Sequence, residues 1–187
     1  MKRYLVILLF SLIRNGYTRA KILLHLNYFH SQGENCFFSS SHFGTEPQHI
    51  SVGNNVWVAT RVNFITHDVS VHMVKSFLNN QNLNFDYVGY IKIGSNIFIG
   101  ANSTIMPNVK IVDNVILGAN SIVTKDILES GVYVGQPLRK IKTFEQYCED
   151  CVNFHTNYPW DNLLKKRKDN KALLKIKRMN YIKTKLD

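Results

Sequence analysis

Cysteine is scarce in this chain, and that scarcity excludes a fold held together by disulfides. Only three cysteines occur among 187 residues, Cys36, Cys148 and Cys151, and the last two form a CxxC pair. Small secreted domains need a full set of paired cysteines. A zinc site would need a second CxxC pair, and no thioredoxin-like context surrounds this one. We therefore predict reduced thiols on a helix, no metal site and a cytoplasmic location.

The N-terminus lacks an apolar run long enough to cross a bilayer. Its run from Tyr4 to Ile13 has ten residues, whereas a spanning helix needs about 20. Arg14 and Asn15 follow, where a signal peptide would have small residues for cleavage. We expect a capping or membrane-grazing helix that continues through His30.

Motifs of covalent catalysis and of nucleic-acid binding are also missing. There is no GxSxG elbow and no convincing Cys/His arrangement, and no RNA- or DNA-binding motif. The net charge of +10 is uneven, because residues 161–187 hold ten Lys or Arg against three Asp. This basic tail is interpretable as a solvated helix, a membrane-surface helix or a nucleic-acid arm. We expect no nucleic-acid partner, and a peripheral contact with the inner membrane face.

What the sequence does have is an apolar residue at every sixth position. The positions are Ile93, Ile99, Ile105, Ile111, Leu117 and Val123, with Val52, Val58 and Phe64 upstream. A period of six fits neither a helix nor an alternating strand, so it describes a repeat unit. Units such as IGSNIF and LGANSI predict an all-β solenoid, in which three hexapeptides make one turn of a parallel β-helix. The first and fifth residues of each unit should point inward.

Asparagine is the usual residue at the fourth position of these units. It occurs there at Asn55, Asn96, Asn102, Asn108, Asn114 and Asn120. Corners of a tightly wound chain need φ > 0, which Gly and Asn tolerate best. The sequence therefore predicts a corner at each of these asparagines.

The period is interrupted once. Phe64 and Ile93 are 29 positions apart where six are expected, so roughly 23 residues leave the coil after His67 and return near Tyr90. Long loops in a regular solenoid are usually functional. We expect this loop, residues 69–90, to choose the acceptor of any reaction.

Residues 18 apart in the uninterrupted part should stack in columns. Small residues form two adjacent columns, Ala59, Gly100, Gly118 and Thr60, Ala101, Ala119, hereafter the small-residue strip. Another column contains His67, Asn108 and Asp126. We expect a flexible chain to lie along the strip, and the titratable ring of His67 to stand beside it.

The segments TEPQHISVGNNVWV, FITHD, IKIGSNIFIGANSTIMPNVKI, LGANSIVTKDI and VYVGQPLRKIK resemble the hexapeptide-repeat acyltransferases of the maltose and galactoside acetyltransferase type. TEP and FITHD look most like enzymes of capsule, exopolysaccharide or lipopolysaccharide assembly. The resemblance implies a left-handed parallel β-helix over residues 36–142, a homotrimer with active sites between subunits, and acetyl-CoA as acyl donor. Residues 1–35 and 143–187 would be helical appendages.

The resemblance also implies roles for single residues. His67 matches the family's catalytic histidine, and a histidine is suited to take a hydroxyl proton near neutral pH. Ala101 and Ala119 match positions against which pantetheine lies. Four residues match the end that meets the nucleotide phosphates: Thr124, Lys125, Arg139 and Lys142. Residues assigned to the acceptor region are Asp68, His72 and Asn108, with Asn108 also a candidate oxyanion donor.

The expected function is transfer of an acetyl group from acetyl-CoA to a hydroxyl of a sugar or a cell-surface polysaccharide precursor. Three alternatives remain open on the sequence: an antibiotic acetyltransferase, an amino-sugar N-acetyltransferase and a non-catalytic β-helix scaffold.

Overall fold

The computed structural model describes residues 6, 8, 10, 12–80, 82–83, 87–155 and 171–186. They belong to two units, residues 1–144 and 145–187, and each unit is described by itself. Most of the N-terminal apolar run and residues 156–170 of the basic tail lie outside the described residues, so the expectations for those segments stay predictions.

The first unit is built mainly from short strands. Its elements are α2 (Gly16–His25), β1 (Ser31–Gln32), β2 (Phe37–Phe38), η1 (Pro47–His49), β3 (Ile50–Val52), β4 (Val56–Val58), β5 (Asn63–Phe64), β6 (His67–Asp68), α3 (Val71–Phe77), β7 (Tyr87–Val88), β8 (Ile91–Ile93), β9 (Ile97–Ile99), β10 (Thr104–Ile105), β11 (Val109–Ile111), β12 (Val115–Leu117), β13 (Ile122–Val123), β14 (Gly131–Val134) and β15 (Arg139–Lys142). The second unit holds most of α4 (Phe144–His155) and all of α6 (Lys171–Leu186).

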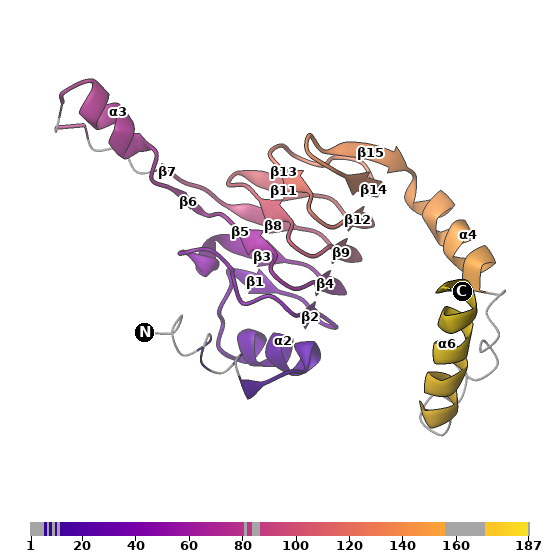
Figure 1. The fold of residues 1–187 in the computed structure, drawn as a ribbon. Helices are drawn as coiled ribbons and strands as arrows, with labels where there is room; N and C mark the ends of the chain where they lie inside the picture. Colours follow the sequence, from indigo (N-terminus) through magenta and orange to yellow (C-terminus); the bar gives the residue numbers. More distant parts are fainter. Residues whose placement is uncertain are drawn as a thin grey trace. The chain divides into compact units, whose positions relative to one another are not determined.

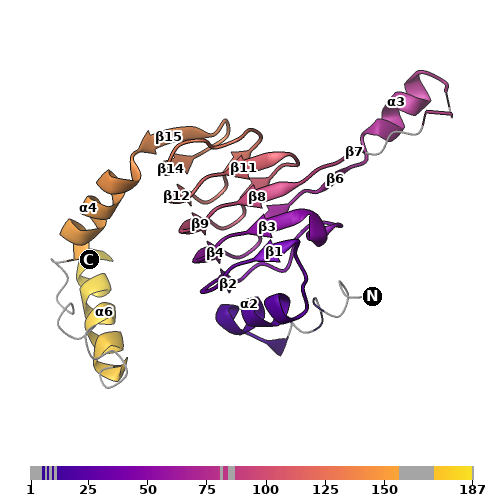
Figure 2. The ribbon, with the colours of Figure 1, turned by 180° about the vertical axis from the view of Figure 1, so that it is seen from behind.

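Three sheets carry nearly all of these strands. Sheet A contains β1, β3, β8 and β11, sheet C contains β5, β10 and β13, and sheet B contains β2, β4, β9, β12, β14 and β15. From β3 onward the chain visits sheets A, B and C in rotation, so each turn stacks on the previous one (Figure 1). Figure 2 shows the same stacking from behind. Residues 31–134 are called the coil below.

Strand register confirms the eighteen-residue turn. Ile97 pairs in parallel with Val115, a separation of 18 residues. Across the interruption Val56 pairs with Ile97, a separation of 41. The difference is the 23 residues predicted to leave the coil. At the upper end, β15 pairs antiparallel with β14, which covers the open edge of sheet B.

The predicted inward positions are the core of the coil. First-position residues such as Ile99, Ile105 and Leu117 are fully buried, as are the fifth-position residues Val109 and Val115. Residues between them on the strands face outward, giving the buried–exposed–buried pattern of β9 and β11. Each buried aliphatic side chain contributes about 1.5–3 kcal/mol relative to exposure, so the six-residue period is the main source of stability of the coil.

Replacing Ile99 with Ala should lower the free energy of unfolding by about 2–5 kcal/mol, because it removes buried methyl groups and leaves a cavity. The matched control is Lys110→Ala, whose side chain is exposed and which should change that free energy by less than about 0.5 kcal/mol. Urea unfolding followed by circular dichroism measures both. Equal losses in the two variants would contradict the interior position of Ile99.

The predicted corner asparagines all have left-handed backbones. Their φ values lie between 54° and 60° at Asn55, Asn96, Asn102, Asn108, Asn114 and Asn120. Asn55, Asn96 and Asn114 also join through side-chain amide hydrogen bonds of 3.0 Å from one turn to the next. Arg61 occupies the same position with φ 56°, and its guanidinium donates to the side chain of Asn102 at 2.7 Å. Here a non-Asn residue at a corner is held by its neighbour.

At Asn120, whose φ is 59°, substitution by Val should lower the free energy of unfolding by about 1–2 kcal/mol. Left-handed backbone brings Cβ too close to the following carbonyl oxygen, which a β-branched residue cannot relieve. Substitution by Gly, which adopts this conformation readily, is the control and should cost less. Thermal unfolding distinguishes the two, and a Val variant as stable as the Gly variant would show that φ is not the constraint.

The expected helix through His30 is wrong in its extent. The structure has a non-helical stretch at residues 13–15 and then α2, which begins after Asn15 and ends at His25. The side chain of Asn15 accepts hydrogen bonds from the N–H groups of Tyr17 and Thr18 at 2.9 and 3.2 Å, a typical N-cap. Past the helix, Asn27 has φ 45°, which stops propagation. Helix α2 packs against β2 and so covers the first turn of the coil.

The interruption forms an arm, residues 67–90. It leaves as β6 and returns as β7, which pair antiparallel, and it carries the short helix α3 (Figure 1). The sequence predicted the excursion but not the helix. No residue of α3 is buried, and Met73 and Phe77 are 68% and 88% exposed.

The second unit is helical where it is described. Cys148 and Cys151 lie on α4 as free thiols, as expected. Within the described part of the chain, no helix is both long and apolar enough to cross a membrane.

Candidate active site

His67 lies where the arm departs from the coil. It is the fourth residue of the unit that begins at Phe64, so the chain would normally turn a corner there. Instead His67 pairs with Val88 on β7, and the N–H of Gly89 donates to the carbonyl of Thr66 at 2.8 Å. The imidazole is 25% exposed. The departure of the arm thus holds a titratable ring at the surface of the coil, partly shielded from water.

The nearest charged partner of His67 is Glu46. Its Oε1 lies 3.3 Å from His67 Nδ1. Its Oε2 accepts hydrogen bonds from the hydroxyls of Thr45 and Thr66, the latter at 2.9 Å. An ionised carboxylate can only accept, so Nδ1 is the donor, and this tautomer leaves the lone pair on Nε2. Glu46 therefore sets the orientation and the tautomer of the ring.

Glu46 is held in its ionised form. Partial burial pushes the pKa of this carboxyl upward, but hydrogen bonds from Thr45, Thr66 and His67, with the charge of His67, outweigh burial and lower the pKa below its ordinary value. A lowered pKa in the folded state means a stabilising contribution above the unfolded value, lost as pH falls through the folded one. At neutral pH the carboxylate is present to stabilise an imidazolium.

Gly44 lets the loop before Glu46 pass close to the coil. It has φ 71°, and a Cβ at this position would collide with the hydroxyl of Thr66. That hydroxyl also accepts the N–H of Glu46 at 3.2 Å. Beside these groups is an open cavity of about 240 Å³, lined by Ser41, His42, Gly44, Thr45, Asn63, Phe64, Ile65, Thr66 and His67. A small polar molecule can reach the His67 ring from this side.

The residues assigned to the acceptor region divide. Asp68 faces away from His67, as expected for neighbours on a strand, and its Oδ1 accepts the N–H of Ser70 at 2.8 Å. Hydrogen bonds from Ser70 lower the pKa of Asp68. His72 is exposed on α3. Asn108 uses its amide to hold the returning arm, donating to the Tyr87 hydroxyl at 3.1 Å and accepting the N–H of Tyr90 at 3.3 Å.

The small-residue strip forms as predicted. Backbone N–H groups of Ala59 and Gly100 donate to Ile99 and Leu117 on the next turn, and that of Asn120 donates to Ala101. A Cβ on Gly100 would collide with the backbone of Ala119. The strip therefore has no room for larger side chains and presents backbone along one edge of the coil.

The expected position of His67 beside this strip is wrong within one chain. The strip lies at the corner between sheets B and C, before β5, β10 and β13, whereas His67 follows β5 at the corner between sheets C and A. Seven residues separate Thr60 from His67, and extended chain rises about 3.3 Å per residue, so the two sites are on the order of 20 Å apart. Repeat arithmetic placed both columns correctly but not the side of the coil between them.

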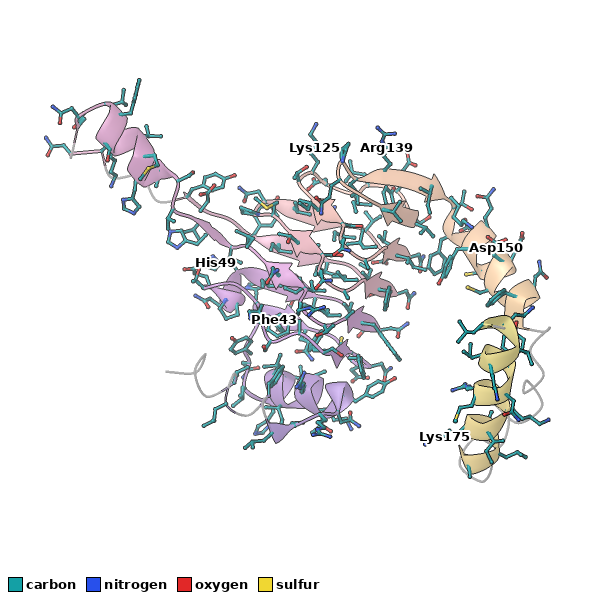
Figure 3. All side chains as sticks on the ribbon, viewed as in Figure 1. Phe43, His49, Lys125, Arg139, Asp150 and Lys175 are labelled. Carbon is teal, nitrogen blue, oxygen red and sulfur yellow. The ribbon has the colours of Figure 1, made fainter. Side chains whose placement is uncertain are left out.

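The residues assigned to the nucleotide phosphates divide in the same way. Thr124 stacks over Met106, which stacks over Ile65, so Thr124 and Lys125 stand on the corner of His67. Arg139 begins β15, just after residues 135 and 136, which bond to the corner at Asn120, so it stands above the strip. Lys142 pairs with Val132 at the other end of β15. Figure 3 shows Lys125 and Arg139 projecting from the same end of the coil.

Comparison with known proteins supports a transferase. The family model described as bacterial transferase hexapeptide (six repeats) matches residues 90–125. A maltose O-acetyltransferase from Clostridium difficile 630 superposes with a TM-score of 0.50 at 26% identity, covering 75% of this chain and 85% of that one. The chain belongs to the hexapeptide-repeat transferase family. Its matching segment contains β8 to β13, the regular part of the coil.

Two curated proteins are also similar in sequence. Protein CapG of Staphylococcus aureus is 46% identical over 118 residues, which are 62% of this chain and 66% of that protein. Putative acetyltransferase YvoF of Bacillus subtilis (strain 168) is 32% identical over 103 residues, 55% of this chain and 53% of that one. The matches therefore span less than two thirds of either relative.

Glu46 and Thr66 are the site residues that sequence reasoning missed. Both lie in the segments that carry the resemblance to the hexapeptide-repeat transferases, TEP and FITHD. The signal was present in the sequence, but the 20 residues between Glu46 and Thr66 correspond to no multiple of the repeat. Only the folded loop before β3 brings the carboxylate to the ring.

Proposed function

We propose that this protein is an acetyl-CoA-dependent O-acetyltransferase that acts on a hydroxyl of a sugar or a cell-surface polysaccharide precursor, with His67 as general base. The observation that carries the proposal is the contact of His67 Nδ1 with the ionised Glu46 carboxylate, 3.3 Å away, at the wall of an open cavity. The membership of the chain in a transferase family supports it, as do relatives named as acetyltransferases.

The reaction follows from the tautomer of the ring. His67 Nε2 takes the proton of the acceptor hydroxyl as its oxygen attacks the thioester carbonyl of acetyl-CoA. The tetrahedral intermediate collapses by breaking the carbon–sulfur bond, and the imidazolium returns the proton to the leaving thiolate. Glu46 stabilises the positive charge that the ring carries between these steps. Such base catalysis contributes roughly 10²–10⁴-fold to the rate.

A second copy of the chain completes the site in this proposal. Pantetheine lying along Ala101 and Ala119 of one chain cannot present its thioester to the His67 of that chain, since sheet C lies between the two corners. The strip of one copy facing the corner of a neighbour would bring them together. Closed rings are the common way for identical chains to do this. The trimer and the left-handed course of the coil are parts of the same proposal.

Cations at the upper end would receive the phosphates of coenzyme A. Lys125 on the corner of His67 and Arg139 above the strip project from the same end of the coil (Figure 3). In the assembled oligomer they would approach the diphosphate from two chains. Guanidinium and ammonium groups are the side chains that bind phosphate best.

Replacing Glu46 with Gln should lower kcat and move the acidic limb of the pH–rate profile to lower pH. The amide keeps the shape of the side chain but removes the charge that stabilises the imidazolium. His67→Ala should lower kcat at least about a hundredfold. Release of free thiol from acetyl-CoA with sugar acceptors measures both.

The control for these two variants is His49→Ala, an exposed histidine on the adjoining η1 turn (Figure 3), which should behave as wild type. Unchanged turnover in His67→Ala would reject this ring as the base. An unshifted profile in Glu46→Gln, with a lower rate, would reduce Glu46 to a structural role.

Mixing two inactive variants should restore activity if the site is shared. His67→Ala keeps an intact strip, and Ala119→Phe keeps an intact His67 while blocking the strip. In randomly mixed oligomers, roughly a quarter of the interfaces pair an intact strip with an intact imidazole. We expect about that fraction of wild-type activity after unfolding and refolding the mixture. Absence of recovery in mixed oligomers would place both halves of the site in one chain.

A further inference from the structure

Helix α6 has an apolar surface that faces water. Ile176, Met179, Ile182 and Leu186 are spaced by three or four residues, as on one side of a helix, and are 55%, 61%, 52% and 82% exposed. These four side chains are called the apolar stripe. By contrast Leu174, on another side of the helix, is 4% exposed. The second unit therefore covers one side of α6 and leaves the stripe open.

The charge of α6 is of one sign. Six of its residues are basic, Lys171, Lys175, Lys177, Arg178, Lys183 and Lys185, and Lys171–Leu186 contains no Asp or Glu. Lys175 and Lys183 lie beside the stripe, while Lys177 and Lys185 lie on the far side, as the 3.6-residue turn dictates. Long lysine side chains can lay their methylene groups along an apolar surface and carry the ammonium outward.

We propose that α6 binds the surface of an anionic lipid bilayer, lying in the headgroup layer with its apolar stripe toward the acyl chains. A helix with a basic face and an apolar face binds there through apolar burial and attraction to anionic headgroups. Sixteen residues are too few to span the roughly 30 Å hydrocarbon core at 1.5 Å per residue, so the helix lies in the plane of the interface.

Charge argues against a second copy of α6 as the occupant. Two such helices would bring twelve like charges together with no acidic residue to pair across the contact, whereas helix pairs rely on opposite charges flanking the seam. Helical pairing also needs an apolar repeat sustained over about three heptads or more, and the stripe spans Ile176–Leu186. Lysine is moreover depleted at the centre of protein interfaces.

The full-length protein should co-sediment with phosphatidylcholine vesicles that contain about one third phosphatidylglycerol, and about tenfold less with phosphatidylcholine alone. Raising the salt concentration should release it, since anionic surfaces act within a Debye length. No co-sedimentation with the anionic vesicles at low salt would overturn the proposal. The measurement needs no turnover, so its failure is independent of the proposed acetyl transfer.

Two pairs of variants separate α6 from the rest of the chain. Ile176→Ser with Met179→Ser should lower the partition coefficient by roughly tenfold or more, because less apolar surface is buried. Lys175→Glu with Lys183→Glu should lower it by at least fivefold for each lysine. Leu128→Ser and Lys92→Glu, exposed positions on the coil, are the matched controls and should bind as wild type. Equal losses in the controls would overturn the assignment to α6.

The remaining occupants are outcomes of the same series. If Ile176→Ser with Met179→Ser changes the number of subunits measured by light scattering, the stripe is a contact between copies and the proposal is wrong. If it leaves vesicle binding unchanged while the charge variants abolish it, the helix is a nonspecific polycation and the stripe has no part in docking. All four variants should acetylate a soluble acceptor at the wild-type rate.

Discussion

Aliphatic side chains at every sixth residue can share one interior only if the chain turns three corners within each eighteen residues. That condition fixes the parallel register of neighbouring turns, such as Ile97 beside Val115. It also places one residue per corner in left-handed backbone, for which asparagine is suited. The columns of the outer surface, including those that form the proposed site, are consequences of the same register.

The site arises where this regularity is broken. At Thr66 and His67 the chain leaves the coil, and the first residues of the arm pair with its returning strand instead of continuing around the corner. The vacated corner is filled from below by the loop that carries Glu46, which Gly44 allows to pass close to the Thr66 hydroxyl. Two threonine hydroxyls and an imidazole then keep a partly buried carboxylate ionised, in a place that a regular coil would fill with a plain turn.

A rigid coil also limits what one chain can do. Sheet C keeps the small-residue strip and the His67 corner apart, and packed strands cannot bend to bring them together. A proposed acyl carrier along the strip is therefore served by the imidazole of another copy. The amphipathic α6 belongs to the second unit, so its proposed contact with a membrane makes no demand on the geometry of the coil.

The sequence by itself determined the coil, because a period of six residues is a local pattern that survives without knowledge of distant contacts. It located the inward residues, the corner asparagines, the 23-residue excursion and the strip. It misjudged the helix through His30, since the N-cap of Asn15 and the left-handed Asn27 bound α2 on both sides. It also set His67 beside the strip, because column arithmetic counts turns but not distance around a turn. The partnership of Glu46, Thr66 and His67 depends on a loop and an arm outside the repeat, so only the tertiary structure could decide it.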